Sequence, residues 1–135
     1  MKESFKIFSD KAFENVGGGG RLMPIEFKNL PFVPKRVFLV SNVHEMELRG
    51  EHAHRRNQQV LVCVAGSITV HLQRADEDGE REHRLIPGEW VFHSNLEWCS
   101  IEFWGRESVM LSFCSDEYDP DDYIHSFREL KELSR

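Results

Sequence analysis

Short runs of apolar and β-branched residues alternate with glycine, proline and charged residues along most of the chain. Runs of this length, bounded by turn residues, are typical of β-strands. The stretch VMLSFC is almost continuously apolar, as expected of a buried strand. The strands that this pattern predicts are Phe5–Phe13, Leu22–Phe27, Arg36–Ser41, Gln59–Val64, Ile68–Leu72, Trp90–Phe92, Cys99–Phe103 and Val109–Cys114.

Turn residues separate these strands. The run Gly17–Gly20 predicts a turn between the first strand and the second, because glycine is the strongest local breaker of regular structure. Ala65-Gly66-Ser67 predicts the turn of a hairpin between the fourth and fifth strands. The highly charged stretch 74–84 is interpreted as a solvated hairpin tip.

The spacing of the apolar residues changes only at the end of the chain. From Asp119-Pro120 onward, apolar residues recur at helical spacing. Asp119 suits the N-cap of a helix and Pro120 its first position. Many short strands followed by one terminal helix predict an all-β barrel or jelly roll with a short C-terminal helix. No repeat or linker is visible, so we expect residues 1–135 to form one domain.

Composition narrows the class of protein. With 40% hydrophobic residues among 135, the chain has enough apolar surface to form a core. Its net charge of −6 argues against nucleic-acid binding, which needs clustered Lys and Arg. No apolar run is long enough to span a bilayer, and the N-terminus lacks a secretory signal. Three scattered cysteines do not suggest a disulfide framework, so we expect a cytoplasmic protein with reduced thiols.

The segment containing His52 and His54 carries the candidate chemistry. Residues two apart in a strand face the same side, so the two imidazoles project together. Inside a jelly roll they would form either a metal site or an acid–base pair. Gln59 follows His54 after four residues, and Gly66 follows after six more. This spacing resembles the first sequence motif of the cupins, and implies a single cupin domain.

Whether a metal is bound depends on the other positions of that motif. Metal-binding cupins usually have Glu where this chain has Gln59, and a neutral amide does not balance the charge of a divalent cation. Cys99 stands where a third histidine is usual. His52, His54 and Cys99 would still suit zinc, which is the alternative. We favour metal-free use of the histidines and expect no cofactor.

The remaining histidines are weaker candidates. The direction in which His71 points depends on its neighbours, and His44 lies in a predicted loop. We expect His83 in the charged tip and His125 on the exposed side of the final helix. His93 lies near the second motif and could reach the mouth of the barrel, but we favour a surface position.

Three stretches identify a closer resemblance. They are RGEHAHRRNQQVLVCVAGSITVHL from Arg49, RLMPIEFKNLPFVPKRVFLV from Arg21, and VMLSFCSDEYDPDDYIHSF from Val109. Together they resemble the bacterial sugar-nucleotide 3,4-ketoisomerases, which are WxcM-like cupins. That family acts on dTDP-4-keto-6-deoxyglucose in deoxysugar biosynthesis. The resemblance implies a metal-free jelly-roll homodimer with exchanged strands that binds a nucleotide sugar.

The resemblance also implies roles for individual residues. Moving a ketone from C4 to C3 requires proton transfer through an enediol, which two histidines with pKa near ~6.5 would serve at neutral pH. We expect His54 to be the base on carbon and His52 its acid partner, or the reverse order. Arg49 would stabilise the enediolate. The other expected substrate contacts are Arg36, Gln59, Trp98 and Cys99.

Departures from the family keep alternatives open. The family tends to have two tyrosines at the places of Phe38 and Leu39, a histidine at Cys99, and an Arg-Gly step where this chain has Gly19-Gly20. A non-catalytic sugar-nucleotide-binding cupin is therefore the second hypothesis, and the metal-dependent cupin is the third.

Overall fold

The computed structural model describes residues 7–9, 14–16 and 20–135. Its strands are Ile7–Ser9 (β1), Glu14–Val16 (β2), Gly20–Leu22 (β3), Arg36–Ser41 (β4), Leu48–His54 (β5), Gln59–Ala65 (β6), Ile68–Arg74 (β7), Arg81–Leu85 (β8), Glu89–His93 (β9), Glu97–Phe103 (β10), Val109–Cys114 (β11) and Tyr123–Ile124 (β12). The described helices are the α-helix Phe127–Leu133 (α1) and the 3-10 turns Phe27–Asn29 (η2) and Pro120–Asp122 (η3). With seven residues, α1 is far too short to span a bilayer, and no other described helix is longer.

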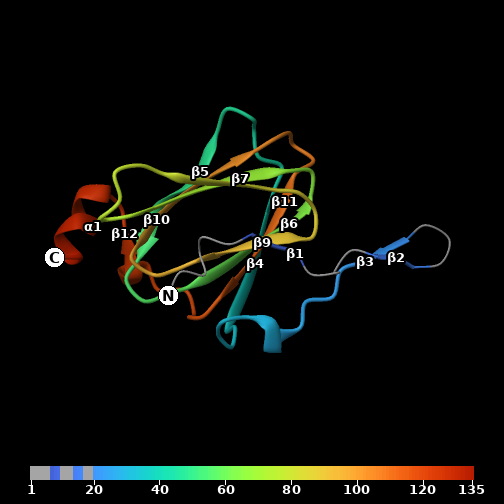
Figure 1. Cartoon of the computed structure of the whole chain (residues 1–135), viewed down its shortest axis with the longest axis horizontal. Helices are drawn as coiled ribbons and strands as arrows, with labels where there is room; N and C mark the ends of the chain where they lie inside the picture. The colour runs from blue at the N-terminus through green and yellow to red at the C-terminus, as the bar shows by residue number, and fades with distance from the viewer. Residues whose placement is uncertain (1–6, 10–13, 17–19) are drawn as a thin grey trace.

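Two antiparallel sheets build the fold. The first sheet has the strand order β1-β9-β6-β11-β4, and the second has the order β12-β5-β10-β7-β8. Figure 1 shows α1 at one end of the molecule and the separate β2–β3 ribbon extending from the other. The expected all-β jelly roll with a short C-terminal helix is confirmed.

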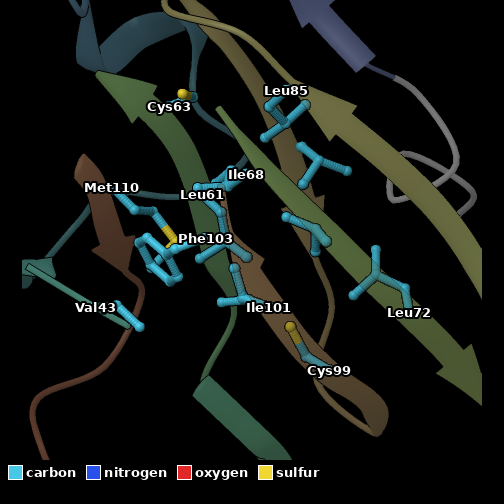
Figure 2. Close-up of a cluster of buried hydrophobic side chains, with 12 residues drawn as sticks. Val43, Leu61, Cys63, Ile68, Leu72, Leu85, Cys99, Ile101, Phe103 and Met110 are labelled. Carbon is cyan, nitrogen blue, oxygen red and sulfur yellow. The ribbon is translucent and has the colours of Figure 1, made fainter. Parts of the chain in front are cut away.

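The main core lies between the two sheets. Figure 2 shows Leu61 of β6 and Met110 of β11 close to Ile68, Ile101 and Phe103 of the second sheet. These side chains are at most 5% exposed. Alternation along each strand places one apolar side chain in two on this inner face, which is why the sheets pack together.

The predicted hairpin between β6 and β7 is wrong. β6 pairs with β9 and β11 in the first sheet, whereas β7 pairs with β8 and β10 in the second. Gly66, with a φ of 68°, turns the chain from one sheet to the other. The sequence pattern does not distinguish this corner from a hairpin, because both need a short glycine turn between buried strands.

The predicted strand Leu22–Phe27 is also wrong in its extent. β3 ends at Leu22, and the following segment has no ladder as far as η2. Its apolar side chains, including Met23 and Ile25, pack against the outer face of the first sheet. Pro24 cannot donate to a ladder, which explains why the strand stops there. The predicted strand Phe5–Phe13 and the glycine turn fall largely outside the described residues.

The C-terminal segment is not one helix. Asp119 caps η3 by accepting a hydrogen bond from the Asp121 N–H at 3.0 Å, with Pro120 at the first position, as predicted. The chain then forms β12, which pairs with the end of β5, and α1 begins only at Phe127. His125 is exposed, but it lies before the helix.

The charged tip is shorter than predicted. β7 extends to Arg74 and β8 begins at Arg81, so the connection is limited to residues 75–80. His83 therefore lies within β8 opposite Val70 and is buried, not solvated.

Candidate active site

One end of the core is polar. On the inner face of β11, Met110 is followed at two-residue steps by Ser112 and Cys114, and all three are buried. Gln59 lies opposite Cys114 and opposite His93 in the ladder. The antiparallel register therefore gathers polar side chains from several strands at the same end of the sandwich.

A bulge in β5 leads directly into the histidine pair. The register between β10 and β5 shifts where His52 pairs with Cys99 and Gly50 with Ser100. Gly50 and Glu51 both have positive φ, of 85° and 57°. Bulges of this kind redirect the side chains that follow them and recur beside functional sites.

A cavity of about 330 Å³ opens at the polar end. Five of the predicted site residues line it, and these are Arg36, Arg49, His52, Gln59 and Cys99. Tyr123 of β12 joins them. The structure therefore brings most of the predicted site together from four strands of both sheets.

His54 lies immediately behind this lining. It is only 1% exposed, and its ring centroid is 4.8 Å from that of His52 in an edge-to-face arrangement. Tyr123 pairs with His54 in the ladder, and its ring lies 4.5 Å from His54 and 5.0 Å from His52. Both histidines project to the same side of β5, as predicted.

The pKa of both rings lies below the unperturbed histidine value of 6.5. Burial lowers the pKa of His52 to about 4, His93 adds to the effect, and a hydrogen bond to the Gly50 backbone opposes it. Burial likewise lowers the pKa of His54 to about 2, helped by His93, His52 and the positive charge of Arg36. The site therefore presents two neutral imidazoles at physiological pH.

His93 is a buried member of the site and not a surface residue. Its Nε2 lies 2.7 Å from the Glu97 carbonyl oxygen, and its Nδ1 lies 3.1 Å from the Gln59 side-chain amide. A carbonyl only accepts, so Nε2 carries the proton. The Gln59 atom that faces His93 Nδ1 is its side-chain oxygen Oε1, and the Gln59 NH₂ donates to Cys114 Sγ at 3.6 Å. Burial lowers the pKa of His93. This chain of contacts fixes Gln59 at the wall of the cavity.

Two arginines give the cavity its positive charge. Arg36 stacks over the rings of Phe38 and Tyr118, with its guanidinium carbon 5.0 Å and 5.3 Å from their centroids. Arg49 is half exposed and lies 3.7 Å from Glu47, a contact that water weakens. Both arginines line the cavity.

Comparison with known proteins gives the family. The family model described as "FdtA: WxcM-like, C-terminal" matches residues 5–135. The chain belongs to this WxcM-like family. It is 34% identical over 116 residues to the TDP-4-oxo-6-deoxy-alpha-D-glucose-3,4-oxoisomerase of Aneurinibacillus thermoaerophilus, covering 83% of this chain and 81% of the relative.

Solved structures agree with this assignment. The QdtA 3,4-ketoisomerase from Thermoanaerobacterium thermosaccharolyticum, a double mutant in complex with TDP, has a TM-score of 0.84 at 29% identity, covering 95% of this chain and 91% of that one. A 3,4-ketoisomerase from Helicobacter canadensis has a TM-score of 0.83 at 26% identity, covering 95% of each chain. The resemblance to sugar-nucleotide 3,4-ketoisomerases is confirmed.

Trp98 of this WxcM-like chain does not line the cavity. It neighbours Cys99 on β10 and so points to the opposite face, where its ring lies 6.3 Å from that of Phe127 of α1. Alternation along the strand excludes both residues from sharing one cavity. Cys99 does line the cavity, and burial raises the pKa of its thiol, so it is not a thiolate.

The metal alternative gains no support from the ligand geometry. Over the described ranges, no group of three or more His, Cys, Asp or Glu side chains is arranged to hold a metal ion. Of its three candidate ligands, His52 and Cys99 line the cavity, whereas His54 lies behind it.

Three residues of the site were not predicted from the sequence, and these are Tyr123, His93 and Asp122. Tyr123 and Asp122 belong to the family-specific ending, but a helical interpretation of that segment hid their approach to His54. His93 follows Val91 by two residues, so alternation along β9 was the signal that it faces inward.

Proposed function

We propose that this chain is a sugar-nucleotide 3,4-ketoisomerase acting on a dTDP-4-keto-6-deoxyhexose in deoxysugar biosynthesis. The observation that carries the proposal is the placement of His52 at the cavity wall, with His54 and Tyr123 packed against it. Membership of the WxcM-like family supports the same activity, because the relatives compared above are 3,4-ketoisomerases.

The reaction needs proton transfer without net oxidation. A base removes the C3 proton, the electrons form an enediolate between C3 and C4, and a proton returns to C4. The hydroxyl proton passes from the C3 oxygen to the C4 oxygen. A neutral imidazole has the free lone pair that the first step requires.

Either histidine could be the base that removes the C3 proton, with the other as its acid partner. The lining of the cavity favours His52 as the base. His52 lines the cavity, whereas His54 is screened from it. His54 would then be the partner imidazole. Arg49 and Arg36 would stabilise the enediolate and the diphosphate, which are both anionic. Gln59, held by His93, would fix one side of the sugar.

Substitution of the histidines tests this assignment. His52→Ala and His54→Ala should each lower kcat by ~10²-fold or more with dTDP-4-keto-6-deoxyglucose, because each removes a proton-transfer partner. In D₂O the wild-type product should carry deuterium at C4 by NMR. His44→Ala, in an exposed loop, is the matched control and should retain full activity.

Other outcomes would identify the competing functions. Near-wild-type rates in both variants would end the isomerase assignment. Tight binding of the keto sugar without deuterium exchange would identify a sugar-nucleotide-binding protein. A stoichiometric transition metal by elemental analysis would identify the metal-dependent cupin.

We also propose a cytoplasmic homodimer. The described cysteines Cys63, Cys99 and Cys114 are buried free thiols, which supports a reducing compartment. The support for a dimer is the apolar outer face of β4, where Val37 and Leu39 are 54% and 56% exposed. Such exposed apolar surface on an edge strand is typical of association sites.

A further inference from the structure

Asp122 is a buried carboxylate next to His54. It is 3% exposed, and its Oδ2 lies 3.4 Å from His54 Nδ1. It sits at the end of η3, directly before the β12 residue Tyr123, which pairs with His54. The pairing of β12 with β5 therefore places Tyr123, and Asp122 directly before it, against the histidine.

Backbone N–H groups of the turn after β5 hold the Asp122 carboxylate in place. Its Oδ1 accepts a hydrogen bond from the Arg56 N–H at 2.8 Å, and its Oδ2 accepts one from the Asn57 N–H at 3.1 Å. The Arg55 N–H donates to the Asp122 carbonyl oxygen at 2.8 Å. These contacts tie the turn after β5 to the η3 segment, so Asp122 and His54 cannot move apart independently.

We propose that Asp122 is a positioning residue that holds His54 in its Nδ1–H tautomer. An ionised carboxylate only accepts hydrogen bonds, so the ring nitrogen that faces it carries the proton. Because the ring is neutral, Nε2 keeps its lone pair. Neither ring nitrogen of His54 makes a hydrogen bond among the described residues, but Nδ1 lies 3.4 Å from Asp122 Oδ2, so Nδ1 is the nitrogen that this carboxylate faces.

This role rests on the proposed function of the site and adds a member to it. Asp122 itself transfers no proton and does not line the cavity. It selects which nitrogen of His54 is the acceptor and sets the direction of that acceptor. The other groups that face His54 are the rings of His52, Tyr123 and His93 and the positive charge of Arg36, and none of these supplies a carboxylate.

Nitrogen NMR of the histidine side chains tests the proposal directly. In ¹⁵N-labelled wild-type protein, His54 should show the Nδ1–H tautomer, its signals being assigned by their absence from His54→Gln. Asp122→Asn should convert His54 to the Nε2–H tautomer or to a mixture, because an amide NH₂ then faces Nδ1. Wild-type His54 in the Nε2–H tautomer would overturn the proposal, whatever the activity of the protein.

Measurements of kcat and KM distinguish a positioning role of Asp122 from a purely structural one. Asp122→Asn should lower kcat on the order of 10²-fold with little change in KM. Asp119→Asn is the matched control, because Asp119 shares the Arg56 guanidinium with Asp122 but makes no described contact with His54. It should retain both the tautomer and kcat. Unchanged tautomer and kcat in a folded Asp122→Asn variant would also contradict the proposal.

Discussion

At the scale of single residues, burial of neutral histidines makes the fold sensitive to acid. Burial lowers the pKa of His52 to about 4 and of His54 to about 2, whereas an unfolded chain has a histidine pKa of ~6.5. Below that pH the unfolded state binds more protons than the folded state. The stability is therefore fully present above pH ~6.5 and is lost as the pH falls toward the folded-state values.

Urea unfolding at several pH values tests this linkage. Each histidine should lower the free energy of unfolding by up to about 1.4 kcal/mol per pH unit below pH ~6.5. The double substitution His52→Gln and His54→Gln should make the pH dependence shallower, and exposed His44→Gln should leave it unchanged. Equal slopes in wild type and the double variant would show that the rings are not buried in the neutral form.

The sequence predicted the residues of this pair but not their protonation. Spacing alone places His52 and His54 on one face of a strand. Their low pKa values arise first from burial and then from neighbours in distant segments, His93 for both rings and Arg36 for His54, which no local pattern brings near. The placement of Trp98 could have been corrected from the sequence alone. Neighbouring residues of a strand face opposite sides, so Trp98 and Cys99 could not both line the cavity.

At the scale of elements, the bulge in β5 is the feature that orients the side chain of His52. Gly50 has a φ of 85°, and a Cβ atom added there would lie 3.0 Å from the Cys99 carbonyl oxygen. Gly50→Ala should therefore destabilise the protein by about 1–2 kcal/mol, as measured by urea unfolding, and should lower kcat by displacing His52.

Gly79 provides the control for this substitution. It lies in the tip between β7 and β8, and an added Cβ atom there would have no neighbour within 4 Å. Gly79→Ala should be close to neutral in both stability and kcat. If Gly50→Ala behaved in the same way, the bulge would not determine the position of His52.

Long strands were predictable because their apolar alternation is an intrinsic property of the sequence. The two-residue strand β12 was not, because it exists only through its pairing with His54 and Ala53. The corner between β6 and β7 was mistaken for a hairpin for a similar reason. The pairing of a strand depends on the tertiary structure, and the sequence of a local turn does not predict it.

At the scale of the whole molecule, the outer face of the first sheet is incompletely covered. Residues 23–32 pack over its centre, through Met23, Ile25, Leu30 and Phe32. Toward the edge, Val37 lies opposite Phe113 and Leu39 opposite Leu111 in the β4–β11 ladder. These cross-strand apolar pairs form one surface beside the edge of β4 that pairs with none of the described strands.

A second copy of the chain is the occupant that we expect on this surface. Sedimentation at micromolar concentration should give twice the mass of one chain. Val37→Glu should shift the protein toward monomer, because it puts a charge into the apolar contact. Met46→Glu replaces another apolar residue, 97% exposed but in a loop outside β4, and should leave the dimer intact. A wild-type monomer at this concentration would contradict the proposed homodimer, and dissociation by both substitutions would indicate that β4 is not its specific contact.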